Sequence, residues 1–216
     1  MEELQNEQIS KTEDPDRSRE GLSSLSDLGL PKLVLGSGSP RRAEILRTVG
    51  WPFEAFAVNI DESRKAGEDA PSYVERLARE KAAAAARNFP SKLVLGADTV
   101  VVVESDILGK PSDEEEARRM LRRLHGRWHE VLTGVALLRN GKSSKSAVAH
   151  EVTQVRFAEM SDDEIQWYVS TGEPLDKAGA YAIQGLGARF IKAINGEYFN
   201  VVGLPVRLVF ELVRQF

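Results

Sequence analysis

The sequence predicts a mixed α/β fold, in which one sheet of parallel and antiparallel strands has helices on its flanks. Strand-like and helix-like segments alternate over the first half of the chain, and turn signals typical of β-hairpins appear only in the second half. The pentapeptide Lys-Leu-Val-Leu-Gly also occurs twice, at 32–36 and at 92–96, each time as an apolar strand that runs into polar residues. A repeat this short can arise by chance. If the two strands are parallel neighbours, however, both open on one crevice at their carboxyl ends, where α/β sheets bind ligands.

The length of the chain suits one sizeable α/β domain or two small lobes that share a core. It has 216 residues, of which 42% are hydrophobic and 29% charged, as is ordinary for a globular protein. Residues 1–30 are rich in Glu, Asp and Ser and poor in large apolar groups. We therefore expect a disordered acidic N-terminal tail at 1–30 and a folded domain at 31–216.

Composition excludes several classes of function. The formal net charge is −4, so no basic field attracts a nucleic acid polymer or an anionic membrane. The chain has no cysteine, which excludes disulfides, thiolate catalysis and Cys-ligated zinc. No apolar run reaches the roughly 20 residues that cross a bilayer, and the first residues resemble neither a secretory signal nor a transit peptide. We therefore expect a cytoplasmic protein.

The first half is expected to hold two strands and two helices before a long central strand. Residues 33–35 form a short apolar strand, and a helix follows with Ser39-Pro40 at its start and Gly50 at its end. Next come a strand at 53–60 and a helix at 71–87, whose second half is rich in alanine.

The central strand is expected at 92–103, because this run is apolar and rich in β-branched residues. Capping-box patterns then open two helices, one at Ser112 that Gly126 ends and one at Ser161 that Gly172 ends.

Two hairpins and a last helix complete the expected elements. Asn140-Gly141 is a strong hairpin signal between strands at 131–138 and 147–157. A second hairpin is expected around Asn195-Gly196, followed by an amphipathic helix over 205–216. Its two strands are expected at 190–194 and 198–202.

The segment Ser37-Gly38-Ser39-Pro40-Arg41-Arg42 leads a small, hydroxyl-rich loop into a helix N-terminus. Such an end offers free N–H groups and partial positive charge. Arginines in a first turn oppose the helix dipole, so a bound phosphate with bidentate Arg hydrogen bonds would explain their position. The alternative is a plain capped helix with solvated arginines.

Two charged residues fall among apolar ones. Asp98 lies inside the central strand, where an aspartate is costly unless it is paired or binds a metal. The alternative is that the strand breaks at Gly96 and Asp98 caps a turn. Lys81 shares the apolar face of its helix with Val74 and Leu77, and a lysine there needs an anion. The alternative is that its ammonium reaches solvent at the helix edge.

Three further polar residues are weaker signals. Lys110 lies between a glycine and a proline on a stiff turn, and Glu62 follows a predicted strand, where it is either functional or a solvated turn residue. Gln184 lies in the glycine-rich segment 176–187, and its amide can read a base edge; the alternative is a flexible connector. Together, two separated carboxylates, several cations and a glycine loop supply what a metal–triphosphate site requires.

The three histidines, His125, His129 and His150, are interpreted as surface or turn residues. His125 and His129 have helical spacing for a metal site, but Gly126 between them should end the helix. The chain also has no Walker A sequence, so ordinary P-loop chemistry is not indicated.

Seven motifs in order resemble the Maf family of nucleoside triphosphate pyrophosphatases, in the branch that acts on dTTP and UTP. The likeness runs from about Leu33 to the C-terminus. The motifs are Ser37-Gly38-Ser39-Pro40-Arg41-Arg42, Glu80-Lys81-Ala82, Gly96-Ala97-Asp98-Thr99, Gly109-Lys110-Pro111, Asp176-Lys177-Ala178-Gly179-Ala180-Tyr181, Ile183-Gln184-Gly185 and Asn200-Val201-Val202-Gly203-Leu204-Pro205. The resemblance implies a fold like that of the inosine triphosphate pyrophosphatases, with two lobes around a cleft, and a homodimer.

The same resemblance implies roles for nine residues. It makes Asp98 the general base, and Glu62 an essential acid that holds a divalent metal, Mg²⁺ or Mn²⁺, together with Asp98. The residues implied to contact substrate phosphates are Ser37, Arg42, Lys81 and Lys110. Those implied to select dTTP and UTP over 7-methyl-GTP are Arg41, Thr99 and Gln184.

The sequence is therefore interpreted as an enzyme that hydrolyses dTTP and UTP, or modified pyrimidine triphosphates, to the monophosphate and pyrophosphate. A non-catalytic nucleotide-binding regulator of cell division is one alternative. A house-cleaning pyrophosphatase for inosine or xanthosine triphosphate is another.

Overall fold

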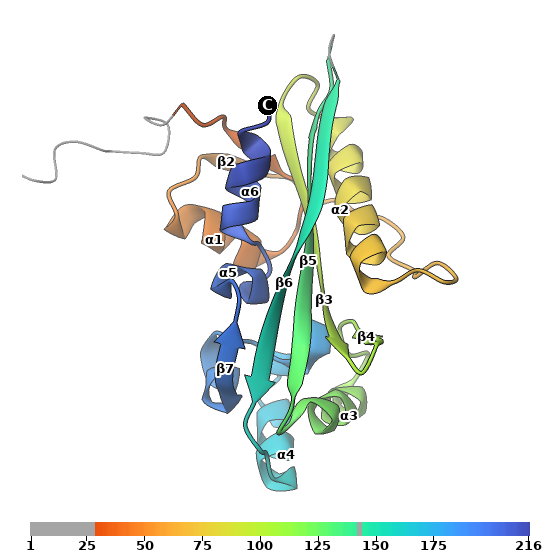
Figure 1. Cartoon of the computed structure of the whole chain (residues 1–216), viewed down its shortest axis with the longest axis vertical. Coiled ribbons are helices and arrows are strands. Elements are labelled where there is room, and N and C mark those ends of the chain that lie inside the picture. The colour runs from red at the N-terminus through yellow and green to blue at the C-terminus, as the bar shows by residue number, and fades with distance from the viewer. Residues whose placement is uncertain (1–28, 142–143) are drawn as a thin grey trace, which may run out of the picture.

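The computed structural model describes residues 29–141 and 144–216 and contains one seven-stranded sheet with helices on its flanks (Figure 1). The strand order is β2-β1-β3-β5-β6-β7, and β4 pairs with β3 outside this path. Parallel and antiparallel pairs occur in the same sheet, so the predicted mixed α/β fold is confirmed. Residues 1–28 of the predicted acidic tail lie outside the described residues.

Three long antiparallel strands form the axis of the molecule in Figure 1: β3 (Leu93–Val103), β5 (Trp128–Arg139) and β6 (Lys145–Phe157). The turn between β5 and β6 falls at the predicted hairpin signal, Asn140-Gly141. The central strand β3 is buried along most of its length, as its apolar, β-branched composition predicted.

The two copies of the repeated pentapeptide lie side by side. Strand β1 (Leu33–Leu35) is parallel to both of its neighbours, β2 (Phe53–Ala55) and β3. Its register with β3 pairs Leu33 with Leu93 and Leu35 with Leu95. Both copies therefore end at the same level of the sheet, which is the arrangement expected if their carboxyl ends open on one crevice.

That crevice is a gap in the pairing along one edge of β3. Strand β5 pairs with one edge of β3 over nearly its whole length. On the opposite edge, β1 pairs with the start of β3 and β4 (Asp106–Leu108) pairs with its end. Strand β1 stops opposite Leu95 and β4 starts opposite Val101. Within the described part of the chain, residues 96–100 have a strand partner on one side only, and Asp98 is the middle of this stretch.

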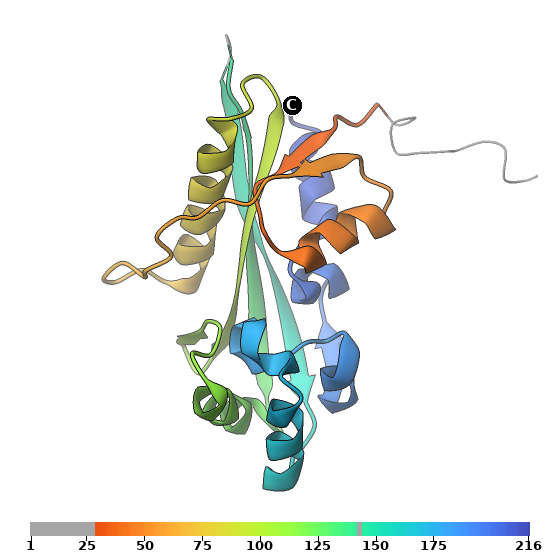
Figure 2. The same cartoon turned by 180° about the vertical axis from the view of Figure 1, so that it is seen from behind.

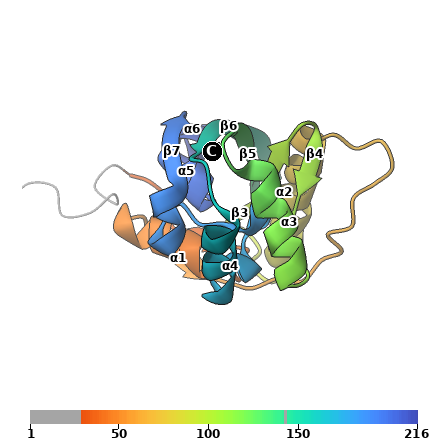
Figure 3. The same ribbon diagram turned by 90° about the horizontal axis from the view of Figure 1, so that it is seen from below.

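Helices cover both faces of the sheet (Figures 2 and 3). Helix α2 (Ala70–Ala86) lies on one face, and α1, α5 and α6 lie on the other. Helices α3 and α4 pack at the far end of the long strands. In the described ranges, each helix is too short or too polar to span a lipid bilayer. The remaining elements are α1 (Pro40–Thr48), α3 (Glu114–Leu124), α4 (Asp162–Ser170), η2 (Glu173–Asp176), η3 (Ala178–Ala180), η4 (Gly185–Phe190), β7 (Ile191–Asn195), α5 (Tyr198–Val202) and α6 (Val206–Val213).

Two apolar clusters on the same face of the sheet form two lobes. One lies under α1 and α6 and includes Leu35, Leu95 and Val209. The other lies between the sheet, α3 and α4 and includes Val103 and Tyr168. Strand β3 contributes residues to both clusters because it is long enough to run through both.

Helix α2 packs closely on the other face of the sheet, the face away from these two clusters, because glycines of β3 and β5 lie beneath it. A Cβ on Gly96 would lie 2.2 Å from the carbonyl oxygen of Ala78, and a Cβ on Gly134 would lie 2.3 Å from that of Val74. The helix backbone therefore rests directly on β3 and β5, and Lys81 is brought over β3.

The second predicted hairpin is wrong. Strand β7 forms as expected, but residues 198–202 form helix α5. The carboxylate of Glu197 accepts a hydrogen bond from the backbone N–H of Asn200, a helix cap that starts α5. Strand β7 pairs with β6 instead, so tertiary pairing and a local cap together override the turn signal.

Other boundaries also differ from prediction. The strand expected at 53–60 ends at Ala55, because its partner β1 ends at Leu35. Ser39 is the N-cap residue of α1, but its side chain makes no capping hydrogen bond. The N-cap of α3 is Asp113, one residue later than expected, whereas the capping box at Ser161 is confirmed.

The interpretation of His129 as a surface or turn residue is wrong. Strand β5 begins three residues earlier than predicted, so His129 lies within it and is only 3% exposed. Its Nε2 lies 2.8 Å from the hydroxyl of Tyr181, and its ring packs edge-on against Phe157. Burial lowers the pKa of His129 to about 4, so the imidazole is neutral in the folded protein at neutral pH.

Candidate active site

A cavity of about 370 Å³ opens at the gap in the edge of β3. Because side chains alternate along a strand, Asp98 reaches it from the α2 face and Thr99 from the opposite face. Eight of the nine predicted site residues line this cavity, namely Arg41, Arg42, Glu62, Lys81, Asp98, Thr99, Lys110 and Gln184. The ninth, Ser37, is buried behind Arg42, and its hydroxyl accepts a hydrogen bond from that guanidinium.

The centre of the site is a cation held between two carboxylates. The ammonium of Lys81 lies 2.6 Å from Oδ1 of Asp98 and 2.7 Å from Oε1 of Glu62. The side chains of Lys81 and Asp98 are only 10% and 11% exposed. Strand β3 continues through Asp98, so the turn-cap alternative for this aspartate is wrong.

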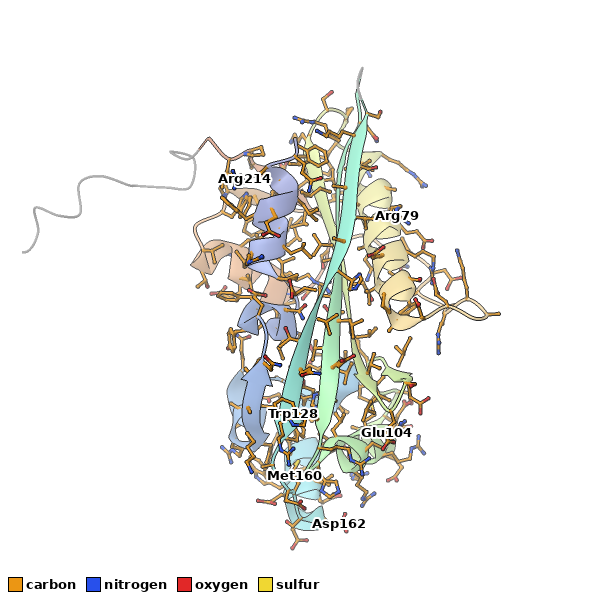
Figure 4. The ribbon with its side chains drawn as sticks, viewed as in Figure 1. Arg79, Glu104, Trp128, Met160, Asp162 and Arg214 are labelled. Atoms are coloured by element: carbon orange, nitrogen blue, oxygen red, sulfur yellow. The ribbon has the colours of Figure 1, made fainter. Side chains whose placement is uncertain are left out.

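Helix α2 presents Lys81 to the site because of its spacing. Arg79, labelled in Figure 4, is exposed, whereas Lys81 lies among the buried residues Val74, Ala78 and Ala82. The ammonium does not escape to solvent at the helix edge, because Asp98 supplies the anion that a buried lysine needs.

Arg42 is fixed by three acceptors. Its Nε donates to the carbonyl of Gly203 at 2.8 Å, one terminal nitrogen donates to Ser37 at 3.2 Å, and the other donates to Thr99 at 3.0 Å. Burial lowers the pKa of Arg42, and the nearby carboxylate of Asp98 acts in the opposite direction. A guanidinium has five N–H donors, so two of those of Arg42 have no acceptor among the described residues.

Arg41 is held by a residue far away in the sequence. Its two terminal nitrogens donate to the carboxylate of Asp176 at 2.8 Å and to the backbone carbonyl of Asp176 at 3.3 Å. Lys177 also contacts the Asp176 carboxylate, at 2.5 Å. Burial raises the pKa of Asp176, but the hydrogen bonds from Lys177 and Arg41 outweigh it and set the value at about 2.

The two remaining predicted residues enter from loops. Lys110 and Gln184 are exposed and line the cavity. A backbone hydrogen bond of 3.0 Å from Gly179 to Gly109 joins the loop of Lys110 to the glycine-rich segment. Two motifs that are about 70 residues apart therefore form one wall.

Three further residues with polar side chains, Tyr73, Lys177 and Tyr181, line the cavity and were not predicted as site residues. Lys177 and Tyr181 belong to a recognised motif, so a signal for them was present. Tyr73 lies about two turns before Lys81 on α2, so the helical spacing that selected Lys81 was the signal for Tyr73.

The described residues hold no group of three or more His, Asp or Glu side chains arranged to bind a metal. Mg²⁺ in proteins is often bound by only one or two carboxylates together with substrate phosphates and water. Asp98 and Glu62 both approach the same cationic atom, which shows that one positive charge can lie between them. The donor set therefore fits a divalent ion that arrives with a phosphate ligand, and it does not fit a closed protein cage.

Comparison with known proteins gives concordant results. The sequence profile described as Maf-like protein matches residues 32–216. A protein of Symbiobacterium thermophilum named dTTP/UTP pyrophosphatase is 52% identical over 187 residues, which cover 87% of this chain and 95% of that protein. A protein of Koribacter versatilis with the same name is 48% identical over 183 residues, which cover 85% of this chain and 93% of that protein.

Among solved structures, the Ham1 protein of Staphylococcus aureus aligns with a TM-score of 0.48 and 16% sequence identity, over 85% of this chain and 98% of its own.

The profile match spans nearly all of the described residues, and the two bacterial relatives share about half of their residues with this protein. The chain therefore belongs to the family of Maf-like proteins.

Proposed function

We propose that this protein is a nucleoside triphosphate pyrophosphatase that hydrolyses dTTP and UTP to the monophosphate and pyrophosphate, with Mg²⁺ or Mn²⁺ as cofactor. The observation that carries the proposal is the buried ammonium of Lys81 between Asp98 and Glu62, in a cavity that Arg42 and Lys110 also enter. The names of the bacterial relatives support the substrate class.

The cations of the site bind and neutralise the triphosphate. The two N–H groups of Arg42 that no acceptor in the described ranges occupies suit a bidentate contact with phosphate oxygens. Lys81 and Lys110 supply point charges that stabilise the negative charge growing on the leaving pyrophosphate. Ser37 acts through Arg42, whose guanidinium it helps to hold.

The carboxylates handle the divalent ion and the proton. Asp98 and Glu62 would hold the ion, which supplies Lewis-acid polarisation of the triphosphate when bound. Oδ1 of Asp98 accepts a hydrogen bond from the Lys81 ammonium, so we assign the role of contacting the attacking water to Oδ2. Asp98 takes the proton as the water oxygen bonds to the α-phosphorus, and the bond from that phosphorus to the bridging oxygen breaks, so that pyrophosphate leaves as one unit.

Base selection is assigned to Arg41, Thr99 and Gln184, all of which line the cavity. The amide of Gln184 both donates and accepts, so it can read the edge of a pyrimidine. Arg41 and Thr99 are both held by hydrogen bonds and present fixed groups to the ligand.

Two measurements on purified protein test the proposal. Asp98→Asn should abolish UTP turnover while the far-UV circular dichroism spectrum stays unchanged; near-normal turnover would remove Asp98 from the mechanism. Product analysis should find the monophosphate and pyrophosphate, whereas orthophosphate with nucleoside diphosphate would contradict the reaction.

A substrate panel separates the alternatives. Standard and modified pyrimidine triphosphates should be turned over faster than the triphosphates of inosine and xanthosine. Binding of UTP without turnover would instead favour a non-catalytic regulator. We further propose a homodimer in the cytoplasm, which gel filtration with light scattering and cell fractionation would test.

A further inference from the structure

Glu62 lies in a connection that contains no helix or strand. Residues 56–69 join β2 to α2, and Glu62 reaches Lys81 from the middle of this segment. The Glu62 side chain is 56% exposed, so packing around the carboxylate does little to fix its position. Another part of the chain must therefore hold the backbone from which it extends.

Helix α2 holds two consecutive carbonyls at this point. The hydroxyl of Tyr73 donates to the backbone carbonyl of Glu62 at 2.7 Å. A terminal nitrogen of Arg76 donates to the backbone carbonyl of Ser63 at 3.0 Å. Tyr73 and Arg76 are three residues apart on α2 and so lie on the same side of it, as neighbours along the helix surface.

Arg76 is itself fixed by a fork-to-fork ion pair at the other end of the same segment. Its Nε and a terminal nitrogen lie 2.7 Å and 2.9 Å from the two carboxylate oxygens of Glu68. The side chains of Arg76 and Glu68 are 12% and 9% exposed. The hydrogen bonds from Arg76 lower the pKa of Glu68 to about 2, so the pair stays charged at all working pH values.

We propose that Tyr73 and Arg76 are positioning residues, which hold the backbone at Glu62 so that its carboxylate meets Lys81 and the metal-bound triphosphate. This inference rests on the proposed function. Neither residue needs to touch the reacting atoms, because each acts on a carbonyl of the Glu62 segment. The same α2 that carries Lys81 thus sets the position of Glu62, and one rigid helix fixes two of the three central charges.

Tyr73→Phe is the sharpest probe, because it removes one hydroxyl and retains the ring, which lies 5.5 Å from the Arg76 guanidinium. We expect kcat for UTP to fall about tenfold, the effect of one lost hydrogen bond, with little change in KM. In a Glu62→Gln background the same change should have no further effect, because there is no carboxylate left to position. Tyr198→Phe, at a tyrosine that is 42% exposed, is the matched control and should leave kcat unchanged.

Two readouts do not depend on turnover. The first is Mn²⁺ affinity in the presence of a non-hydrolysable UTP analogue, measured by electron paramagnetic resonance. This affinity should be several-fold lower in Tyr73→Phe than in the unmodified protein. It should be the same in Glu62→Gln and in the Tyr73→Phe/Glu62→Gln double variant. Amide hydrogen exchange should rise in residues 56–69 of Tyr73→Phe and stay unchanged in β5.

The outcomes separate the two proposals. If the unmodified protein turns over no triphosphate, the proposed function fails, and the exchange experiment still decides whether Tyr73 holds the segment. The positioning role is overturned if Tyr73→Phe lowers kcat equally with and without the Glu62 carboxylate, or if exchange in residues 56–69 does not change.

Discussion

Replacing Gly96 by alanine tests whether the contact between α2 and the sheet sets the distance from Lys81 to Asp98. Gly96 lies two residues before Asp98 on β3, so both face α2. A Cβ at Gly96 would lie 2.2 Å from the carbonyl oxygen of Ala78 and 2.6 Å from the amide nitrogen of Ala82. Both of these atoms belong to the helix backbone and cannot rotate aside as a side chain does.

The cost follows from these distances. Ordinary contacts begin near 3.4 Å, so α2 must move away from β3 by roughly 1 Å, and overpacking of this kind costs about 1–3 kcal/mol. The same movement draws the Lys81 ammonium away from Asp98, which it now approaches to 2.6 Å. A misplacement of about 1 Å in a catalytic group lowers the rate by up to about 100-fold.

Steady-state turnover of UTP and urea unfolding measure the two effects. We expect kcat for Gly96→Ala to fall about 10- to 100-fold, and the urea midpoint to fall without a change in m-value. Gly141→Ala is the matched control, because the nearest described atom to its Cβ would be the Ser91 hydroxyl oxygen, at an ordinary 3.7 Å. A Gly96→Ala protein with native stability and full turnover would refute the argument that a close helix–sheet contact positions the site.

Three single contacts, at His129, Asp176 and Ser161, can be tested in the same way. The pKa of His129 is near 6.5 in the unfolded chain and about 4 in the folded protein, so protonation favours unfolding, and the free energy of unfolding falls by about 3 kcal/mol as the pH drops through this interval. In urea unfolding, the loss of stability between pH 7 and pH 4 should be smaller for His129→Phe than for the unmodified protein. An equal loss would contradict the buried, neutral state of His129. Asp176→Asn removes the charged partner of Arg41, so KM for UTP should rise about threefold to tenfold, the effect of about 1 kcal/mol. If KM and the substrate preference stay unchanged, this ion pair does not position Arg41. Ser161→Ala removes the cap of α4 and should cost about 1 kcal/mol, or roughly 2–4 °C in Tm, with turnover unchanged; a thermal melt that matches the unmodified protein would show that the cap is dispensable.

Much of the secondary structure could be predicted from the sequence, because periodicity, caps and turn residues act over a few neighbours. The helix expected at 71–87 is observed at Ala70–Ala86, and the strand expected at 92–103 is observed at Leu93–Val103. Asp98 could be singled out for the same kind of reason, since a carboxylate within an apolar strand needs a partner whatever the fold.

The partners themselves were decided by the tertiary structure. Lys81 meets Glu62 and Asp98 only because α2 rests on glycines of β3 and β5. The partner of Arg41 is 135 residues away along the chain, a separation over which no local pattern carries information.

The sequence by itself determined the composition of the site and most of its supporting elements. It did not determine that residues 198–202 form a helix, that His129 is buried, or that Ser37 lies behind Arg42. His129 is buried because strand pairing and packing between distant segments outweigh the local preference of a few residues. Residues 198–202 leave the strand because β7 pairs with β6 and Glu197 caps the helix. Ser37 lies behind Arg42 because the distant residues Gly203 and Thr99 fix that guanidinium, and such contacts exist only once the chain has folded.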